Sequence, residues 1–444
     1  MSQKYYTEKT RPNKIVKRPV REGQEAMLNA YPEKEALVEI RGLDIEYGSG
    51  FKKFRAINDL NLNIYKGEVL GLVGESGSGK STTGRAVVGL TPYSRGHIKL
   101  GDVIVPKVMK RGLKFGKKLA EYKRTLNYMA NKVQMIFQDP SNSLNPNINI
   151  EKIVSEGLDN LKISKQVYLS DLDQSITRKF IELYGEDKFV EITSTKLEKA
   201  YEAAESRSEL NDQVLSKIKN FVQSTNDNLE NAKTMLDLIA KVEQDKEQAK
   251  NKSEKEIKKM LIIDMLKQVG LDESILQRYP LEFSGGQQQR IGISRSIVLR
   301  PKILVADEPI SALDVSIQAQ VVNIFNELKE RYKLTILFIA HDLRMVEYIS
   351  DRIAVIYKGV LLEVGPTEVI IKNPLHPYTK SLLDAVPSIE SKKGSLIGFV
   401  YNSGMHKYTK DIQPVWNDLG NKHFVLGTKQ EIEKWKNNDY SPNK

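Results

Sequence analysis

One short segment constrains the fold of this chain more than any other. Residues 69–73 form an apolar run typical of a buried strand, a glycine-rich loop follows at once, and a helical pattern begins near Lys80. A buried strand that turns through glycines into a helix is typical of a mostly parallel α/β sheet. Further apolar strand patterns, separated by helical segments, extend this prediction to residues 303–306, 335–340 and 352–357.

The loop matches the pattern G-x-x-x-x-G-K-[ST] at every position. Its glycines allow backbone N–H groups to surround phosphate oxygens, and the N-terminus of the following helix adds partial positive charge. We expect Lys80 to reach the β- and γ-phosphates of a nucleotide and the Ser81 hydroxyl to bind Mg²⁺. The predicted nucleotide-binding residues of this segment are Gly74, Glu75, Ser76, Gly77, Ser78, Gly79, Lys80, Ser81 and Thr82.

Two carboxylates follow another apolar strand pattern. Asp307 and Glu308 come directly after residues 303–306, at the end of a strand where sheets of this class place their ligands. One acid can hold Mg²⁺ while its neighbour activates the attacking water, so we assign Asp307 to the metal and Glu308 to general base catalysis. Capping of the following helix is the alternative role.

Two further polar residues end predicted strands. Gln138 follows the pattern of residues 133–137, and its neutral amide can touch both Mg²⁺ and the attacking water. His341 follows the strand that ends at Ala340. A single histidine is more often structural than catalytic, and spacing alone leaves both roles open for this one.

A second anion site is predicted where glycines precede another helix, at Ser284, Gly285, Gly286 and Gln287. The chain has only one lysine-bearing phosphate loop. Two anion sites and one such loop indicate a nucleotide shared between two subunits.

Composition narrows the class of protein. The 444 residues are too many for one compact core, and 68 Lys and Arg against 57 Asp and Glu give a net charge of +11, which suits nucleic acid, an anionic membrane or simple solubility. The absence of cysteine excludes disulfides, thiolate metal sites and cysteine-bound iron–sulfur clusters. No stretch approaches the ~18 apolar residues that a spanning helix needs.

The chain is predicted to have several regions. Residues 1–36 are expected to be a basic, polar N-terminal tail, because their charges and prolines disfavour a packed fold. The main domain is expected over residues 37–365, interrupted at 160–256 by an insertion of polar helices with apolar residues at helical spacing. Residues 366–444 are expected to form a small C-terminal extension.

As an ordered set, these motifs resemble the nucleotide-binding domain of an ABC transporter ATPase. The resemblance implies a P-loop NTPase fold of ABC type, with a mostly parallel core sheet, an antiparallel β part and a helical subdomain. It implies that ATP lies between the phosphate loop of one subunit and the signature residues 284–287 of its partner. It also places Gln138 in the Q-loop, Asp314 in the D-loop and His341 at the switch histidine.

The resemblance further implies an aromatic side chain that stacks on adenine. We choose Tyr47, and Phe51 and Phe54 stay open because the glycine-containing loop between them blurs the register.

A narrower resemblance comes from residues 373–383, with His376-Pro-Tyr378 at their centre, and from the Ala-Val-Pro of residues 385–387. They resemble the C-terminal extension of oligopeptide/dipeptide permease ATPases, and residues 309–320 are similar to the F-type (OppF-like) subunit. The resemblance implies ATP hydrolysis that powers oligopeptide import. It implies a peripheral position on the cytoplasmic face of the cell membrane.

The partners implied by this resemblance are two integral-membrane permease subunits and a paralogous D-type ATPase subunit or a second copy of this chain. An extracytoplasmic peptide-binding protein would take part indirectly, and no nucleic acid partner is expected. The implied cofactors are ATP and Mg²⁺. Many relatives carry cysteines for an iron–sulfur cluster after the His-Pro-Tyr motif; this chain has none, so we predict no cluster.

The insertion at residues 160–256 raises an alternative function, because soluble ABC-type ATPases of chromosome maintenance or repair also insert helices at this point. No apolar repeat is sustained over the heptads that a coiled-coil arm requires, and the C-terminus is of permease type. A non-enzymatic scaffold is disfavoured because Glu308, Gln138 and His341 are all present.

Overall fold

The computed structural model describes residues 5–11, 14–48, 50–109, 112, 114–225, 228–311, 313–384, 400–409 and 411–441. The chain divides into two compact units. The first comprises Met1–Pro140 and Pro301–Lys444, and the second comprises Ser141–Arg300.

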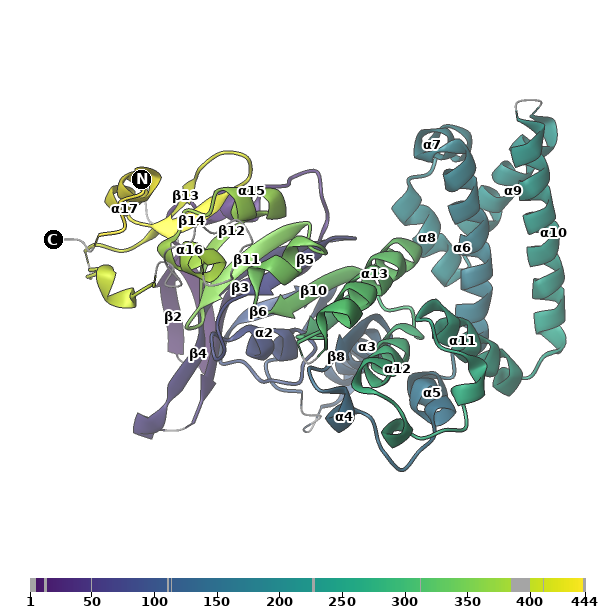
Figure 1. Ribbon diagram of the computed structural model, residues 1–444, viewed down its shortest axis with the longest axis horizontal. Coiled ribbons are helices and arrows are strands. Elements are labelled where there is room, and N and C mark those ends of the chain that lie inside the picture. Colours follow the sequence, from purple (N-terminus) through teal and green to yellow (C-terminus); the bar gives the residue numbers. More distant parts are fainter. Residues whose placement is uncertain are drawn as a thin grey trace. The chain divides into compact units, whose positions relative to one another are not determined.

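The first unit is built on an eight-stranded sheet whose order is β13-β14-β12-β11-β5-β10-β9-β8 (Figure 1). Five neighbouring strands are parallel, and three antiparallel strands extend one side. All residues of β5, β9 and β10 are buried, which explains their uninterrupted apolar runs. The strands are β5 (Val69–Val73), β8 (Val133–Ile136), β9 (Ile303–Asp307), β10 (Thr335–Ala340), β11 (Arg352–Tyr357), β12 (Val360–Pro366), β13 (Val415–Asp418) and β14 (Phe424–Gly427).

A separate antiparallel sheet completes the β structure of this unit, in the order β4-β3-β6-β7. Its strands are β3 (Ala36–Tyr47), β4 (Phe54–Tyr65), β6 (Arg95–Leu100) and β7 (Val103–Ile104). A parallel core sheet beside an antiparallel β subdomain is the architecture predicted from the sequence.

Helices cover the core sheet of the first unit (Figure 1). Helix α2 (Lys80–Val87) packs against β9 and β10, α14 (Leu343–Glu347) against β10, and α15 (Thr367–Lys372) against β12. The remaining helices longer than one turn are α3 (Gly116–Lys132), α13 (Val315–Tyr332), α16 (Pro377–Asp384) and α17 (Lys429–Lys436).

The C-terminal extension continues the core sheet. Strand β14 pairs with β12 through Glu363↔Val425 and Val364↔Phe424, and β13 pairs with β14. Val425 of β14 packs with Ile432 and Trp435 of α17 in a small buried cluster. The predicted region 366–444 is therefore packed onto the core sheet, and its residues 385–387 lie outside the described part of the chain.

Residues 1–36 differ from the unpacked tail that the sequence predicted. Helix α1 (Gln24–Leu28) packs against β4 and β13. The side chains of Asn63 and Tyr65 donate hydrogen bonds to the Leu28 carbonyl at 2.8 and 3.1 Å. Met27, Leu28 and Tyr31 are buried. Charged residues surround these apolar residues in the sequence. Burial of the apolar side chains nevertheless stabilises the packing of this segment against β4 and β13.

The same region also forms a hairpin of β1 (Tyr5–Arg11) and β2 (Lys14–Pro19). Glu8 accepts a hydrogen bond from the Gly96 amide at 3.1 Å and pairs with Lys107. Arg18 donates to the buried carboxylate of Asp44 and pairs with Asp59. Ion pairs with residues distant in the sequence therefore fix this hairpin. Amino-acid composition alone cannot predict such pairs.

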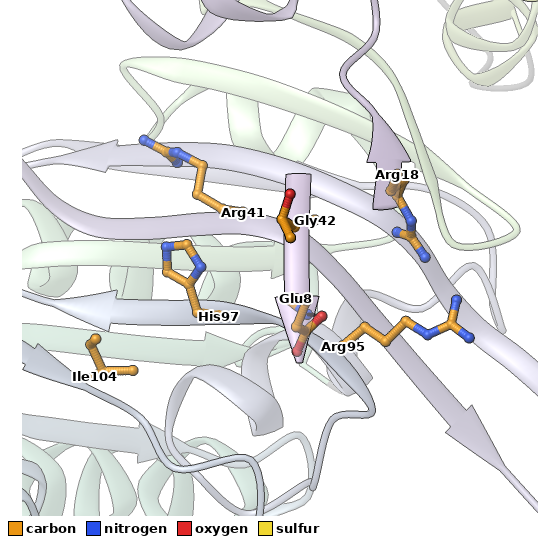
Figure 2. A pocket seen from close by; sticks show the side chains of 9 residues that line it. Glu8, Arg18, Arg41, Gly42, Arg95, His97 and Ile104 are labelled. Atoms are coloured by element: carbon orange, nitrogen blue, oxygen red, sulfur yellow. Dashed lines mark hydrogen bonds between the residues drawn. The ribbon is translucent and has the colours of Figure 1, made fainter. Parts of the chain in front are cut away.

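Figure 2 shows Glu8 and Arg18 at a pocket of about 400 Å³ on the antiparallel β subdomain. Arg41, Arg95 and His97 also line it. Arg41 donates to the Ile40 carbonyl and pairs with Glu39, and Arg95 lies 3.9 Å from Asp44. The positive groups of this pocket are thus balanced by the protein's own acceptors.

The second unit is helical. Its helices are α5 (Ile150–Leu161), α6 (Ser164–Tyr184), α7 (Glu186–Thr193), α8 (Leu197–Ser206), α9 (Glu209–Ser224), α10 (Leu229–Asn251), α11 (Glu254–Gln268) and α12 (Gly285–Ile297), and the four-residue α4 (Pro140–Ser143) stands at its boundary. Helices α6 to α10 occupy the predicted insertion.

The insertion has a hydrophobic core of its own. Phe180 is fully buried and packs against Tyr184 and Phe221, with ring centroids 4.8 and 5.7 Å apart. Asp173 is buried as well and pairs with Lys246 while accepting from Asn211 at 2.9 Å. A bundle in which helices α6 to α10 pack around one core differs from a two-helix coiled-coil arm. Within the described parts of the chain, every helix is too short or too polar to span a lipid bilayer.

We predict that Arg18→Met loosens the N-terminal hairpin. Burial alone would raise the pKa of Asp44, but hydrogen bonds from Arg18 and from the Asp59 amide outweigh it and lower that pKa. The ionised pair therefore stabilises the fold above the unfolded pKa of about 3.9, and this contribution is lost as the pH falls through the lower folded value.

The melting temperature of the Arg18→Met variant should lie below that of the wild type at pH 7, corresponding to about 1–3 kcal/mol, and the difference should shrink toward pH 3. Lys436→Met, which removes an exposed pair with Glu433, is the matched control and should change little. A pH-independent difference would contradict the role of Asp44.

Candidate active site

The phosphate loop lies between β5 and α2, as its sequence predicted. Gly77 and Gly79 have φ values of 79° and 104°, a region that residues with a side chain rarely adopt. A Cβ atom on Gly74 would come within 2.1 Å of the Ile356 carbonyl oxygen. Glycine is therefore required at these positions so that the loop can turn tightly and expose its N–H groups.

Lys80 is buried at the start of α2. Its Nζ donates to the carbonyl oxygens of Gly74 and Glu75 at 2.7 and 2.9 Å. Burial lowers the pKa of this ammonium, although Glu308 and Asp307 act against the shift. The cation is thus held inside the loop, beside the place where a bound phosphate would lie.

The predicted catalytic residues converge on Glu308, directly after β9. The Gln138 amide donates to a Glu308 carboxylate oxygen at 2.8 Å, and His341 Nδ1 lies 3.9 Å from the same oxygen. The other oxygen lies 3.8 Å from Lys80 Nζ. Parallel pairing produces this convergence, because Gln138, Glu308 and His341 follow neighbouring strands at one edge of the sheet.

Asp307 and Ser81 meet at the end of the same sheet. Ser81 Oγ donates to Asp307 Oδ1 at 2.7 Å. Asp307 is fully buried, and its Oδ2 has no hydrogen-bond partner among the described residues. Burial raises the pKa of this carboxyl despite the opposing effects of Ser81, Arg85 and Lys80.

A divalent cation fits this donor set. A hydroxyl, a side-chain amide and a carboxylate with one oxygen that accepts no hydrogen bond are oxygen ligands of the kind that Mg²⁺ prefers. Within the described ranges no group of three or more His, Cys, Asp or Glu side chains is arranged as a metal site. A metal here would therefore depend on Ser81, Gln138 and Asp307 together with a nucleotide's phosphates.

One cavity of about 590 Å³ is lined by the phosphate loop together with Gln138, Glu308 and His341, whereas Asp307 is not among its lining residues. This volume suits a small-molecule ligand. Tyr47 and Phe54 line the cavity, with 45% and 62% of their surfaces exposed, and either ring is free to stack on a base. The side chain of Phe51 lies outside the described part of the structure, so the choice among the three aromatic residues stays a prediction. The other lining residues are Ala56, Glu75, Ser76, Gly77, Gly79, Lys80, Ser81, Thr82, Gln138, Glu308, His341 and Leu382.

Ser78 of the phosphate loop has a structural role. Ser78 is buried, and its carbonyl accepts a hydrogen bond from the Gly359 amide at 2.8 Å. The Ser78 hydroxyl has no partner among the described residues. Ser78 thus connects the loop to the turn that follows β11.

The signature residues belong to the second unit, where Ser284 is the N-cap of α12. Ser284 and Gln287 form a capping box, with the Ser284 amide donating to Gln287 Oε1 at 3.1 Å. Ser284, Gly285 and Gln287 are exposed, and Gly286 is partly exposed. The N-terminus of this helix is therefore open to an anion. Asp314 is exposed at the N-cap of α13, and Ala312 of the same loop lies outside the described residues.

Sequence reasoning missed three residues of the site. Ala56 in β4 and Leu382 in α16 line the cavity, and the Tyr378 hydroxyl accepts a hydrogen bond from the Glu75 amide at 2.7 Å. The sequence shows the His-Pro-Tyr motif but not its target, because 303 positions separate the two bonded residues.

Comparison with known proteins decides the family. The profile described as "ABC transporter" matches residues 57–311. The "Oligopeptide transport ATP-binding protein OppF" of Streptococcus pyogenes serotype M1 is 38% identical over 404 residues, which cover 90% of this chain and 98% of the relative. The chain belongs to the ATP-binding proteins of the oligopeptide and dipeptide ABC transporters.

Further comparisons support this family assignment. The profile "Oligopeptide/dipeptide transporter, C-terminal region" matches residues 362–410. The OppF protein of Bacillus subtilis is 36% identical over 400 residues, and the dipeptide transport ATP-binding protein DppF of Lactococcus lactis subsp. cremoris is 37% identical over 415 residues. The matches span 90% and 91% of this chain and 98% of each relative. The predicted resemblance and the ABC-type P-loop fold are confirmed.

We predict that Lys80→Met weakens ATP binding by this transporter ATPase. Removing hydrogen bonds from a charged donor to phosphate should raise the dissociation constant about 10- to 150-fold, the equivalent of about 1.5–3 kcal/mol. Titration with a fluorescent ATP analogue measures the change. Lys358→Met is a suitable control, because Lys358 is near Glu75 but exposed; equal affinities for both variants would contradict the role of Lys80.

Proposed function

We propose that this chain is the F-type, ATP-hydrolysing subunit of an ABC importer for oligopeptides. The convergence of Lys80, Gln138 and His341 on Glu308 within one cavity carries the hydrolytic part of the proposal. The peptide cargo is supported by the names of relatives that match this chain nearly from end to end. The alignment includes the permease-type C-terminal region.

The site residues have separate roles in phosphoryl transfer. Lys80 and the loop N–H groups bind the phosphates, and Glu308 takes the proton of the attacking water while Gln138 and His341 orient that water. Ser81, Gln138 and Asp307 would hold Mg²⁺, which supplies charge neutralisation at the phosphates when bound. The hydrogen bond between Gln138 and Glu308 supports this assignment, because it aims the carboxylate before substrate arrives.

We propose that each nucleotide site is completed by a second ATPase subunit. The exposed N-terminus of α12, with Ser284 at its cap, would bind the γ-phosphate held by the partner, and Asp314 would lie at the same interface. The partner is a paralogous D-type subunit or a second copy of this chain. The exposed capping box supports this arrangement because it leaves the helix N-terminus accessible.

The assembly is proposed to include two integral-membrane permease subunits, with a peptide-binding protein outside the membrane acting indirectly and without nucleic acid. This chain would lie peripherally on the cytoplasmic face. Family membership supports the complex. It also favours transport over chromosome maintenance or repair, since helices α6 to α10 of the insertion pack around one core and do not form a two-helix arm.

We predict that Glu308→Gln preserves ATP binding and slows hydrolysis roughly 10²–10⁴-fold, because the amide keeps the shape of the side chain but cannot accept a proton. Steady-state ATPase assays and nucleotide titration separate the two effects. Glu330→Gln, an exposed change on α13, is the control. An unchanged hydrolysis rate would remove Glu308 from the role of base.

Affinity purification from native membranes tests the transport assignment. With the Glu308→Gln variant and ATP, we expect two polytopic permease subunits and a second ATPase to be recovered and identified by mass spectrometry. The complex should be lost when ATP is omitted and Lys80→Met is used, since closure of the two ATPases requires bound nucleotide. Recovery of chromosomal or ribosomal proteins without a membrane partner would contradict the proposal.

A further inference from the structure

One hydrogen bond joins the C-terminal extension to the phosphate loop. The hydroxyl of Tyr378, in α16, accepts from the backbone N–H of Glu75 at 2.7 Å. Tyr378 is buried, with 3% of its surface exposed. Glu75 is the first variable residue of the loop, so the bond holds the loop at the point where it leaves β5.

A chain of buried contacts fixes Tyr378 in this position. His376 Nδ1 accepts from the Tyr378 amide at 3.1 Å, and the His376 amide donates to Glu363 Oε2 at 3.1 Å. The other Glu363 oxygen accepts from the Leu375 amide at 2.9 Å and lies 2.6 Å from His423 Nε2. Burial lowers the pKa of His376, which favours the neutral ring that can accept at Nδ1. Strand β12 therefore anchors the start of α16.

Aromatic packing restricts the Tyr378 ring. Its centroid lies 4.6 Å from that of Tyr357 and 5.3 Å from that of Tyr401. Leu382, on the same helix, lines the nucleotide cavity. The extension thus supports the loop with a hydrogen bond and supplies part of the cavity wall.

Both backbone polar groups of Glu75 are hydrogen-bonded. Tyr378 binds its N–H, and Lys80 Nζ donates to its carbonyl oxygen at 2.9 Å. The Lys80 ammonium has a third N–H donor left for a phosphate, whereas the Tyr378 hydroxyl binds the backbone of the loop. We propose that Tyr378 is a positioning residue for the phosphate loop, through which the C-terminal extension sets the affinity for nucleotide.

The proposal rests on ATP binding by this subunit and is independent of its cargo. Tyr378 and Tyr401 belong to one aromatic cluster, but the Tyr401 hydroxyl bonds to His406 Nε2 at 2.9 Å and contributes nothing to the loop. The two residues therefore offer a matched pair. Each tyrosine-to-phenylalanine change removes one hydroxyl from the cluster, and only one of them removes a loop contact.

Tyr378→Phe and Tyr401→Phe should be compared in the full-length protein by titration with a fluorescent ATP analogue and by steady-state ATPase assays. We expect Tyr378→Phe to raise the dissociation constant and the KM for ATP about 3- to 10-fold, with little change in kcat at saturation. Tyr401→Phe should leave both constants unchanged. Equal affinities in the two variants and the wild type would overturn the proposal.

Amide hydrogen exchange without nucleotide gives a second measurement. Peptides covering residues 69–81 should exchange faster in Tyr378→Phe and at the wild-type rate in Tyr401→Phe, because only the first variant frees the Glu75 N–H. Unchanged exchange in Tyr378→Phe would overturn the proposal. Wild-type protein that fails to bind ATP would contradict the proposed function instead, and the exchange result does not depend on that binding.

Discussion

The parallel pairing of β8, β9, β10 and β5 is the constraint on which the active site depends. The register aligns Ala340 with Val73 and Ile339 with Asp307, so the strands end together. Buried strands must pair their backbone N–H and C=O groups, and a slip of one residue would move a following side chain by about 3.3 Å. Four separate polar motifs can meet because this ladder fixes where each of them begins.

The charges at this edge are costly to bury, and that cost is informative about function. Asp307 is buried beside Ser81, and Lys80 is buried within the phosphate loop. Glu308 has a φ of 47°, an uncommon value for a residue with a side chain, and its N–H donates to the Ile339 carbonyl at 3.0 Å. A nucleotide phosphate and a divalent cation would complement these groups and offset the cost of burying them.

The two terminal regions show how distant parts of the chain support this site. The N-terminal hairpin is fixed by Arg18 on Asp44 and by Glu8 on the Gly96 amide. The C-terminal extension adds strands to the core sheet and reaches the phosphate loop through Tyr378. Composition indicated an unpacked tail at one end, and a small extension was expected at the other. The sequence does not show how either region is anchored, because the anchoring groups are few and lie far along the chain from their partners. In the insertion, the apolar residues at helical spacing include Val214 and Ile218, which are buried, but also Leu229, which is 73% exposed.

The sequence by itself determined the strand, loop and helix around Lys80, the strands that carry Asp307 and His341, and the helical nature of the insertion. These features follow from local periodicity, glycine placement and motif spacing, which are properties of neighbouring residues. Only the tertiary structure decided that Gln138 bonds to Glu308, that one oxygen of Asp307 lacks a hydrogen bond among the described residues, and that Tyr378 holds the Glu75 amide. Such contacts join residues up to 303 positions apart, and they depend on which strands pair and which side chains are excluded from water.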